Sequence, residues 1–213
     1  PQFPDLLPQL EVSARYVTTR LHQLDAEVID AGFVSDAREA GVAAEKLRVA
    51  DCDLVVIFLA TYLTSSMVLP IAQRAKTPVL VIDLQPTEAM DHSTFDTGQW
   101  LAYCGQCPVP EVANVFRRAG IPFRSVSGYL RQESAWARII QWVHAANVRA
   151  TLRTARHGLM GHLSPGMLAV PTALTTVPTT SCPPLACPPF DSPRYPANAG
   201  TPPPPTPRAH PTT

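Results

Sequence analysis

The chain has 213 residues, of which 46% are hydrophobic and 16% are charged, with 17 basic and 17 acidic side chains. This length and composition can bury one ordinary hydrophobic core. The balanced charge argues against a nucleic-acid surface and against a polybasic membrane patch, because both need a basic excess. The longest apolar run, residues 54–60, is too short to span a bilayer, and no signal-peptide pattern opens the sequence.

Cysteine usage bears on the compartment. The chain has 5 cysteines, an odd number without the spacing of a small disulfide scaffold. This favours a reduced, cytoplasmic setting. The sequence begins at Pro1, in what reads as the middle of a segment, so we expect that it is cut at its front.

The first elements alternate between helix and strand. Apolar residues at helical spacing predict a helix over residues 6–24. Residues 27–31 (EVIDA) predict a short strand closed by a glycine. A helix is predicted over residues 36–50, with Ser35 or Asp36 as its N-cap.

Two continuous apolar runs follow, which is typical of parallel strands covered on both faces. They lie at residues 53–60 and 78–84. Between them, residues 64–76 predict a helix that is kinked or broken at Pro70. Later elements are predicted as a helix over 111–119, a strand over 123–127, a helix over 133–146 and a last strand over 156–162.

This alternation with short connections predicts the α/β class, as a doubly wound, flavodoxin-like parallel sheet with helices on both faces. Ligands of such sheets bind beyond the carboxyl ends of the strands. The candidate site loops are therefore residues 60–66, 84–98, 127–131 and 161–167.

The composition changes after residue 168. Of the 24 prolines, 14 lie from Pro171 onward, and the charged residues there are Asp191, Arg194 and Arg208. Proline removes backbone donors, and few large apolar groups remain to offset the ordering entropy. We expect an α/β domain over 1–168 and a disordered tail over 169–213, whose spaced prolines could alternatively bind proline-recognition modules.

Few motifs carry chemistry. Cys104 and Cys107 form a CxxC pair, but the preceding sequence does not match a thioredoxin-like site, so a redox role is the weaker interpretation. We expect no zinc site, and no GxGxxG, GxxxxGK[ST] or GxSxG motif occurs. The histidines (His92, His157 and His162) and the carboxylates Asp83 and Asp96 are more simply structural, with Asp83 capping a turn.

An ordered set of short strings resembles the N-terminal domain of the L-arabinose isomerase and L-fucose isomerase superfamily, closest to the arabinose isomerase-like branch. The strings lie at residues 1–4, 61–66, 73–76, 84–87, 95–101, 109–111 and 162–167. The resemblance implies a sugar ketol isomerase. In that family a divalent metal, usually manganese, is held by glutamates and histidine of a later domain; it polarises the sugar oxygens while a glutamate moves the proton.

Those catalytic and metal-binding residues would follow the point where this chain becomes proline-rich. The resemblance therefore implies a fragment that is inactive alone, and we expect no catalytic and no metal-binding residue in it. It further implies a substrate pocket completed by a neighbouring subunit, as a homo-oligomer or by docking to full-length subunits. The residues expected near the rim of that pocket are Gln2, Gln85, Gln106, His162 and Met167.

The break after residue 168 leaves two explanations open: a frameshift or gene-model error, or a genuine truncated homologue. In the second case the chain is a non-catalytic sugar-binding or subunit-docking module. The family also places its first, central strand just ahead of Pro1, and without that strand the resemblance implies an exposed sheet edge or a gap.

Overall fold

The sheet is built from three parallel strands in the part of the chain described by the computed structural model, residues 3–93 and 96–155. The strands are β1 (Val55–Phe58), β2 (Val79–Gln85) and β3 (Phe123–Tyr129), in the order β1-β2-β3. Val55 of β1 pairs with Val79 of β2, which pairs with Phe123 of β3. The predicted parallel α/β sheet is therefore confirmed.

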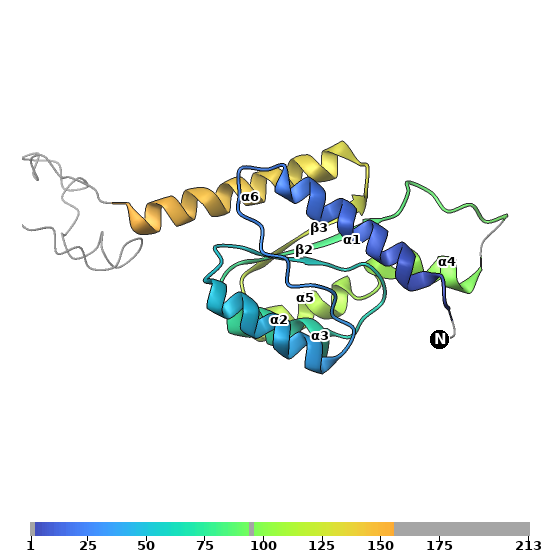
Figure 1. Cartoon of the computed structure of the whole chain (residues 1–213), viewed down its shortest axis with the longest axis horizontal. Coiled ribbons are helices and arrows are strands. Elements are labelled where there is room, and N and C mark those ends of the chain that lie inside the picture. The colour runs from blue at the N-terminus through green and yellow to red at the C-terminus, as the bar shows by residue number, and fades with distance from the viewer. Residues whose placement is uncertain (1–2, 94–95, 156–213) are drawn as a thin grey trace, which may run out of the picture. The chain divides into compact units, whose positions relative to one another are not determined.

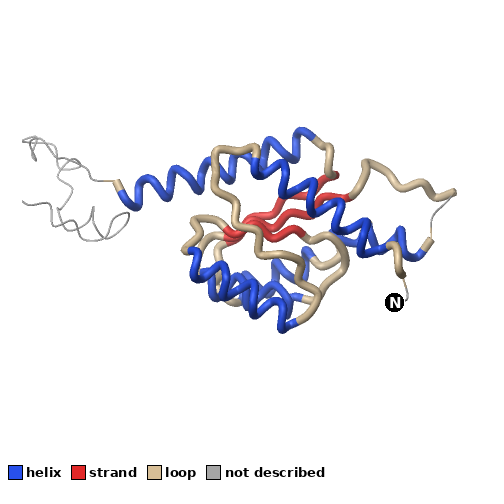
Figure 2. Tube along the Cα trace, in the orientation of Figure 1, coloured by secondary structure: helices blue, strands red, loops and turns tan. Residues whose placement is uncertain are grey.

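Helices cover both faces of this sheet (Figures 1 and 2). The helices are α1 (Leu6–His22), α2 (Ala37–Ala50), α3 (Ser65–Ala75), α4 (Thr97–Ala102), α5 (Val109–Arg118) and α6 (Glu133–Thr154), with a 3-10 turn η1 (Cys104–Gln106) after α4. Helices α2, α3 and α5 pack with the side chains of Val55, Ile57, Val79 and Val81 on one face. Helices α1 and α6 pack with Leu80, Ile82, Leu84 and Val126 on the other.

Local sequence explains where several helices begin. Asp36 is the N-cap of α2, and its carboxylate accepts a hydrogen bond of 2.7 Å from the Glu39 amide. Asp96 and Gln99 form a reciprocal capping box at the start of α4, a helix that the sequence did not predict. Pro70 lies inside α3 without ending it, so a break at Pro70 is wrong, while the kink stays a prediction. A proline there removes one hydrogen bond of the helix, and burial of Val68, Ile71 and Ala72 holds the helix together.

The strand predicted at residues 27–31 is wrong, because these residues form no regular structure. Residues 27–35 instead run in extended coil between α1 and α2, and Gly32 adopts a positive φ of 85°. No backbone hydrogen bond within the described residues joins this coil to β1. A strand needs a hydrogen-bonded neighbour, and none lies beside this coil.

The end of the chain is described only in part. Residues up to Leu152 form one compact unit, and α6 continues to Thr154, eight residues beyond its predicted end. The strand predicted at 156–162, the domain boundary at 168 and the tail over 169–213 all lie outside the described residues. Among the described helices, none combines the length and apolar character that crossing a membrane requires.

Candidate functional site

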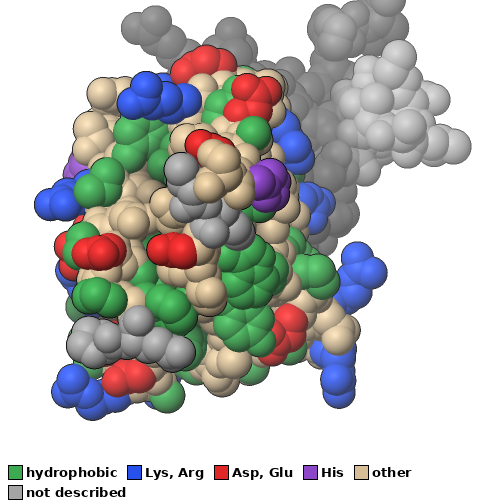
Figure 3. All heavy atoms as spheres, turned by 90° about the vertical axis from the view of Figure 1, so that its right-hand side faces the viewer, with side chains coloured by type: hydrophobic (Ala, Val, Ile, Leu, Met, Phe, Trp, Pro, Cys, Tyr) green, Lys and Arg blue, Asp and Glu red, His purple; other side chains and the backbone are tan. Residues whose placement is uncertain are grey.

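The carboxyl ends of the strands form one edge of the sheet, which we call the carboxyl rim. It comprises the loops after β1, β2 and β3 together with α4 and η1. The described residues of three of the four predicted site loops therefore lie along this rim, and the fourth loop, 161–167, lies outside the described residues. Figure 3 views the molecule from the side that shows α4 at the right of Figure 1, and there hydrophobic side chains lie beside acidic ones.

Two of the predicted rim residues fall on this edge. Gln85 is the last residue of β2 and is half-buried, while Gln106 ends η1 and is exposed. The backbone carbonyl of Gln85 accepts a hydrogen bond of 2.8 Å from the Leu130 amide, which connects the end of β2 to the loop after β3. The remaining predicted rim residues, Gln2, His162 and Met167, lie outside the described residues.

Hydrogen bonds tie the loops of the rim together. The Thr61 hydroxyl donates to the Leu101 carbonyl at 2.7 Å, and so connects the β1 loop to α4. The Ser65 hydroxyl donates to Glu111 at 2.7 Å, and so connects the starts of α3 and α5. Thr87 and Tyr103 share a hydrogen bond of 2.5 Å between their hydroxyl oxygens. The rim is therefore a connected polar surface rather than a set of separate loops.

The Cys104–Cys107 turn sits directly on the end of β1. A Cβ atom on Gly105 would lie 2.2 Å from the Leu59 carbonyl oxygen, so only glycine allows this approach. The Cys104 side chain is buried and Cys107 is exposed. Burial, and secondly the neighbouring Cys107 thiol, raise the pKa of Cys104 to about 11. A nucleophilic redox thiol needs a lowered pKa, so this environment disfavours the redox interpretation.

This environment predicts slow alkylation of Cys104 in the native chain. With a pKa of about 11, Cys104 carries at pH 8 about one hundredth of the thiolate of an ordinary thiol, and its burial slows access further. Iodoacetamide labelling followed by mass spectrometry should modify exposed Cys107 first. In the unfolded chain the labelling rates of Cys104 and Cys107 should converge. Faster labelling of Cys104 than of Cys107 in the native chain would contradict the raised pKa and the burial of Cys104.

Asp83 is the buried carboxylate of the rim. It lies in β2 opposite Ser127 of β3, is 1% exposed, and accepts a hydrogen bond of 2.8 Å from the Ser127 hydroxyl. Its second oxygen, Oδ1, has no hydrogen-bond partner among the described residues. Burial raises the pKa of Asp83 to about 6, and the Ser127 hydrogen bond opposes this rise. Asp83 therefore does not cap a turn, as the sequence suggested, but is a strand residue whose charge is costly.

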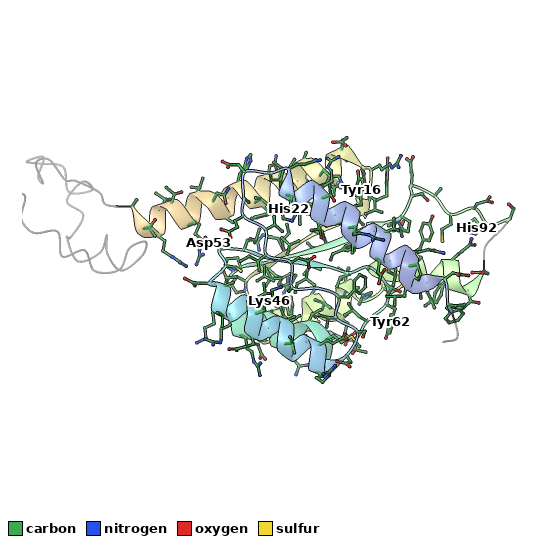
Figure 4. All side chains as sticks on the ribbon, viewed as in Figure 1. Tyr16, His22, Lys46, Asp53, Tyr62 and His92 are labelled. Carbon is green, nitrogen blue, oxygen red and sulfur yellow. The ribbon has the colours of Figure 1, made fainter. Side chains whose placement is uncertain are left out.

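The other titratable candidates do not gather into a centre. Asp96 caps α4, and His92 lies in the long loop after β2 (Figure 4). Over residues 3–93 and 96–155, no three His, Cys, Asp or Glu side chains come together where they could hold a metal ion. These residues therefore do not fit a manganese site, and we assign no metal-dependent step to them.

A second candidate site lies at the outer edge of β1 and extends to the loop after β1. A cavity of about 980 Å³ lies between residues 27–35 and β1, and α1, α2 and α3 contribute to its walls. We call it the edge groove. Neither Gln85 nor Gln106 lines the edge groove, whereas Thr61 of the rim does.

Sequence reasoning named Asp83 but missed its burial inside β2. The signal was visible, because Asp83 is the one charged residue in the apolar run at 78–84. The Thr87–Tyr103 pair carried none, since the long loop and α4 bring the two residues together only in the fold. The edge groove was predicted by no residue pattern. Only the resemblance implied an exposed sheet edge or a gap.

Comparison with known proteins does not identify the chain. No protein-family profile matches it, and no curated protein matches it either.

Proposed function

We propose that the chain is a non-catalytic part of a sugar ketol isomerase, similar to the N-terminal domain of L-arabinose and L-fucose isomerases. One observation carries the proposal. Strings on which the resemblance rests are distant in sequence but hydrogen-bonded to one another at the carboxyl rim: Thr61 to Leu101, and Ser65 to Glu111. An edge assembled from these strings is what a shared substrate pocket requires.

In this proposal the rim binds the sugar and supplies no catalytic residue. The exposed Gln106 and the half-buried Gln85 offer amide groups that can donate to and accept from sugar hydroxyls. Manganese would supply Lewis-acid catalysis in a full-length enzyme, held by residues beyond this domain. The pocket would be completed by a neighbouring subunit, in a cytoplasmic homo-oligomer or by docking to full-length subunits.

A second candidate function is a free-standing sugar-binding or subunit-docking module. The edge groove favours docking, because a largely apolar hollow beside an unpaired strand edge is a surface that other polypeptide segments can cover. This function differs from the first in one respect: sugar binding and docking would then be the whole activity, with no catalytic partner.

Calorimetry with L-arabinose and L-fucose, each with and without manganese chloride, tests the rim. We expect binding that manganese does not change, and no ketose product from the chain alone. Replacing Gln85 or Gln106 by alanine should weaken binding about tenfold, because each loses a hydrogen bond worth about 1.4 kcal/mol.

Gln9→Ala is the matched control, because Gln9 is exposed on α1 and lies outside the rim. Its affinity should equal that of the unchanged chain. Turnover by the isolated chain would contradict the non-catalytic assignment. Absence of heat with both sugars would remove the sugar-binding role and leave docking.

A further inference from the structure

The charges of the chain are balanced in number but not in distribution. Residues 1–108 carry fourteen acidic and seven basic side chains, whereas residues 109–155 carry two acidic and seven basic ones. The seven basic side chains of the second stretch are all arginines: Arg117, Arg118, Arg124, Arg131, Arg138, Arg149 and Arg153. The net charge of zero therefore conceals a basic stretch of the chain.

Four of these arginines and one tryptophan lie along one side of the fold. Arg138, Trp142 and Arg149 follow one another at spacings of four and seven residues, which places them on one side of α6. The Arg124 guanidinium of β3 lies 5.4 Å from the centroid of the Trp142 ring, so this side of α6 borders β3. Arg124 and Arg117 of α5 line one hollow of about 590 Å³ at the start of β3. We call these five exposed residues the arginine flank.

No described acidic side chain forms an ion pair with an arginine of the flank. The two glutamates of residues 109–155 have other partners: Glu133 pairs with Arg20 at 3.2 Å, and Glu111 accepts a hydrogen bond of 2.7 Å from the Ser65 hydroxyl. The sequence beyond residue 155 carries three arginines and one acidic side chain, Asp191. The chain itself is therefore a poor source of carboxylates for the flank.

Arg124 is held in place by its own surroundings. Its Nη1 donates a hydrogen bond of 2.9 Å to the Phe123 carbonyl, and its guanidinium contacts the Trp142 ring. Because these contacts order the side chain beforehand, a partner that binds it pays less of the ordering entropy. The remaining N–H groups of a guanidinium match the two oxygens of a carboxylate.

The flank is short, which bears on the kind of anion that it fits. Arg138 and Arg149 are eleven positions apart on α6, which corresponds to roughly 16 Å along the helix. A nucleic acid carries negative charge without interruption and would extend past the flank. The rest of the described chain has twice as many acidic as basic side chains and would repel it. A short acidic peptide segment can end within the flank, so the charge distribution favours a polypeptide.

We propose that the arginine flank is a docking surface for a short acidic segment of a partner protein. Carboxylates of that segment pair with Arg117, Arg124, Arg138 and Arg149, and an apolar group next to them packs on the Trp142 ring. None of these residues belongs to the carboxyl rim. Docking at the flank is therefore independent of the proposed sugar binding.

Fluorescence anisotropy of a labelled hexaglutamate peptide, titrated with the full 213-residue chain, tests the flank. We expect saturable binding that weakens about tenfold between about 20 and about 200 mM sodium chloride. Arg124→Glu combined with Arg138→Glu should weaken binding about tenfold at the lower salt concentration, because two attractions become repulsions. The matched control is Arg15→Glu combined with Arg38→Glu, which changes the net charge equally at exposed positions on α1 and α2. Its affinity should stay within about twofold of the unchanged chain.

If the Arg124→Glu protein does not fold, Arg138→Glu combined with Arg149→Glu replaces it, since both positions are exposed on α6. Absence of hexaglutamate binding at low salt overturns the proposal, as does equal weakening by the matched control. A labelled single-stranded thymidine oligonucleotide of about six nucleotides carries a similar charge. If it binds as tightly as hexaglutamate or more tightly, the assignment to an acidic polypeptide is overturned in favour of nucleic acid.

Discussion

Replacing Trp136 by alanine should lower the free energy of unfolding by about 3–5 kcal/mol, the range expected when a fully buried large aromatic side chain is removed. Trp136 is 1% exposed and belongs to the cluster that joins α1 and α6 to the sheet. Its indole N–H donates to the Leu130 carbonyl at 2.7 Å. The Arg20 guanidinium lies 4.7 Å from the ring centroid, and Tyr16 packs edge-on against the ring. The substitution removes all of these contacts and leaves a cavity.

Urea denaturation followed by circular dichroism measures this loss. Trp142→Ala is the control, since Trp142 also lies on α6 but is 37% exposed and contacts Arg124 with its ring. Its cost should stay below about 1 kcal/mol. Should the alanine variant not fold, Trp136→Phe isolates the lost hydrogen bond at about 1–3 kcal/mol. A loss under about 1 kcal/mol for Trp136→Ala would show that α1 does not depend on this contact.

The stability of the chain should fall as the pH rises from about 4 to about 7, by about 3 kcal/mol relative to an Asp83→Asn variant. Burial raises the pKa of Asp83 from 3.8 to about 6. Between these values the folded chain holds a proton that the unfolded chain has released. The stabilisation that protonated Asp83 provides is therefore complete below about pH 4. It declines between about pH 4 and pH 6 and is lost above about pH 6.

The measurement is urea denaturation of both proteins from pH 4 to pH 8. Asparagine matches aspartate in size and cannot ionise, so the difference between the two curves isolates Asp83. Ser127→Ala should steepen the decline, because it removes the hydrogen bond that favours the charged form. Glu88→Gln, at an exposed position, should leave the slope unchanged. If the free energies of unfolding of the unchanged chain and of Asp83→Asn changed with pH in parallel, the raised pKa of Asp83 would be contradicted.

Apolar periodicity was sufficient to predict most of the fold. The helices α1, α2 and α3 and the strands β1, β2 and β3 lie where the patterns indicated, because each buries a face whose spacing is visible in the sequence. The short helix α4 and the turn η1 were missed. Their residues have mixed polarity, and the capping box of Asp96 and Gln99 and the close approach of Gly105 to β1 stabilise them instead.

Residues 27–31 show the limit of local pattern. The adjacent β-branched residues Val28 and Ile29 favour a strand, yet strand structure depends on a partner that lies elsewhere in the chain. Only the tertiary structure shows that the edge of β1 is separated from them by the edge groove. The same holds for the rim, where Gln85 and Gln106 were named from a resemblance while the fold brought Thr61 to Leu101 and Ser65 to Glu111.

The sequence by itself determined the class of the fold, the order of its elements and the composition change after residue 168, because these depend on residues close together in the chain. The tertiary structure decided which polar groups are buried. It placed Asp83 beside Ser127 with one oxygen unpaired, buried Cys104 at the start of η1, and left the edge of β1 open. Burial and the choice of hydrogen-bond partner depend on contacts between distant segments, so a local sequence pattern does not predict them.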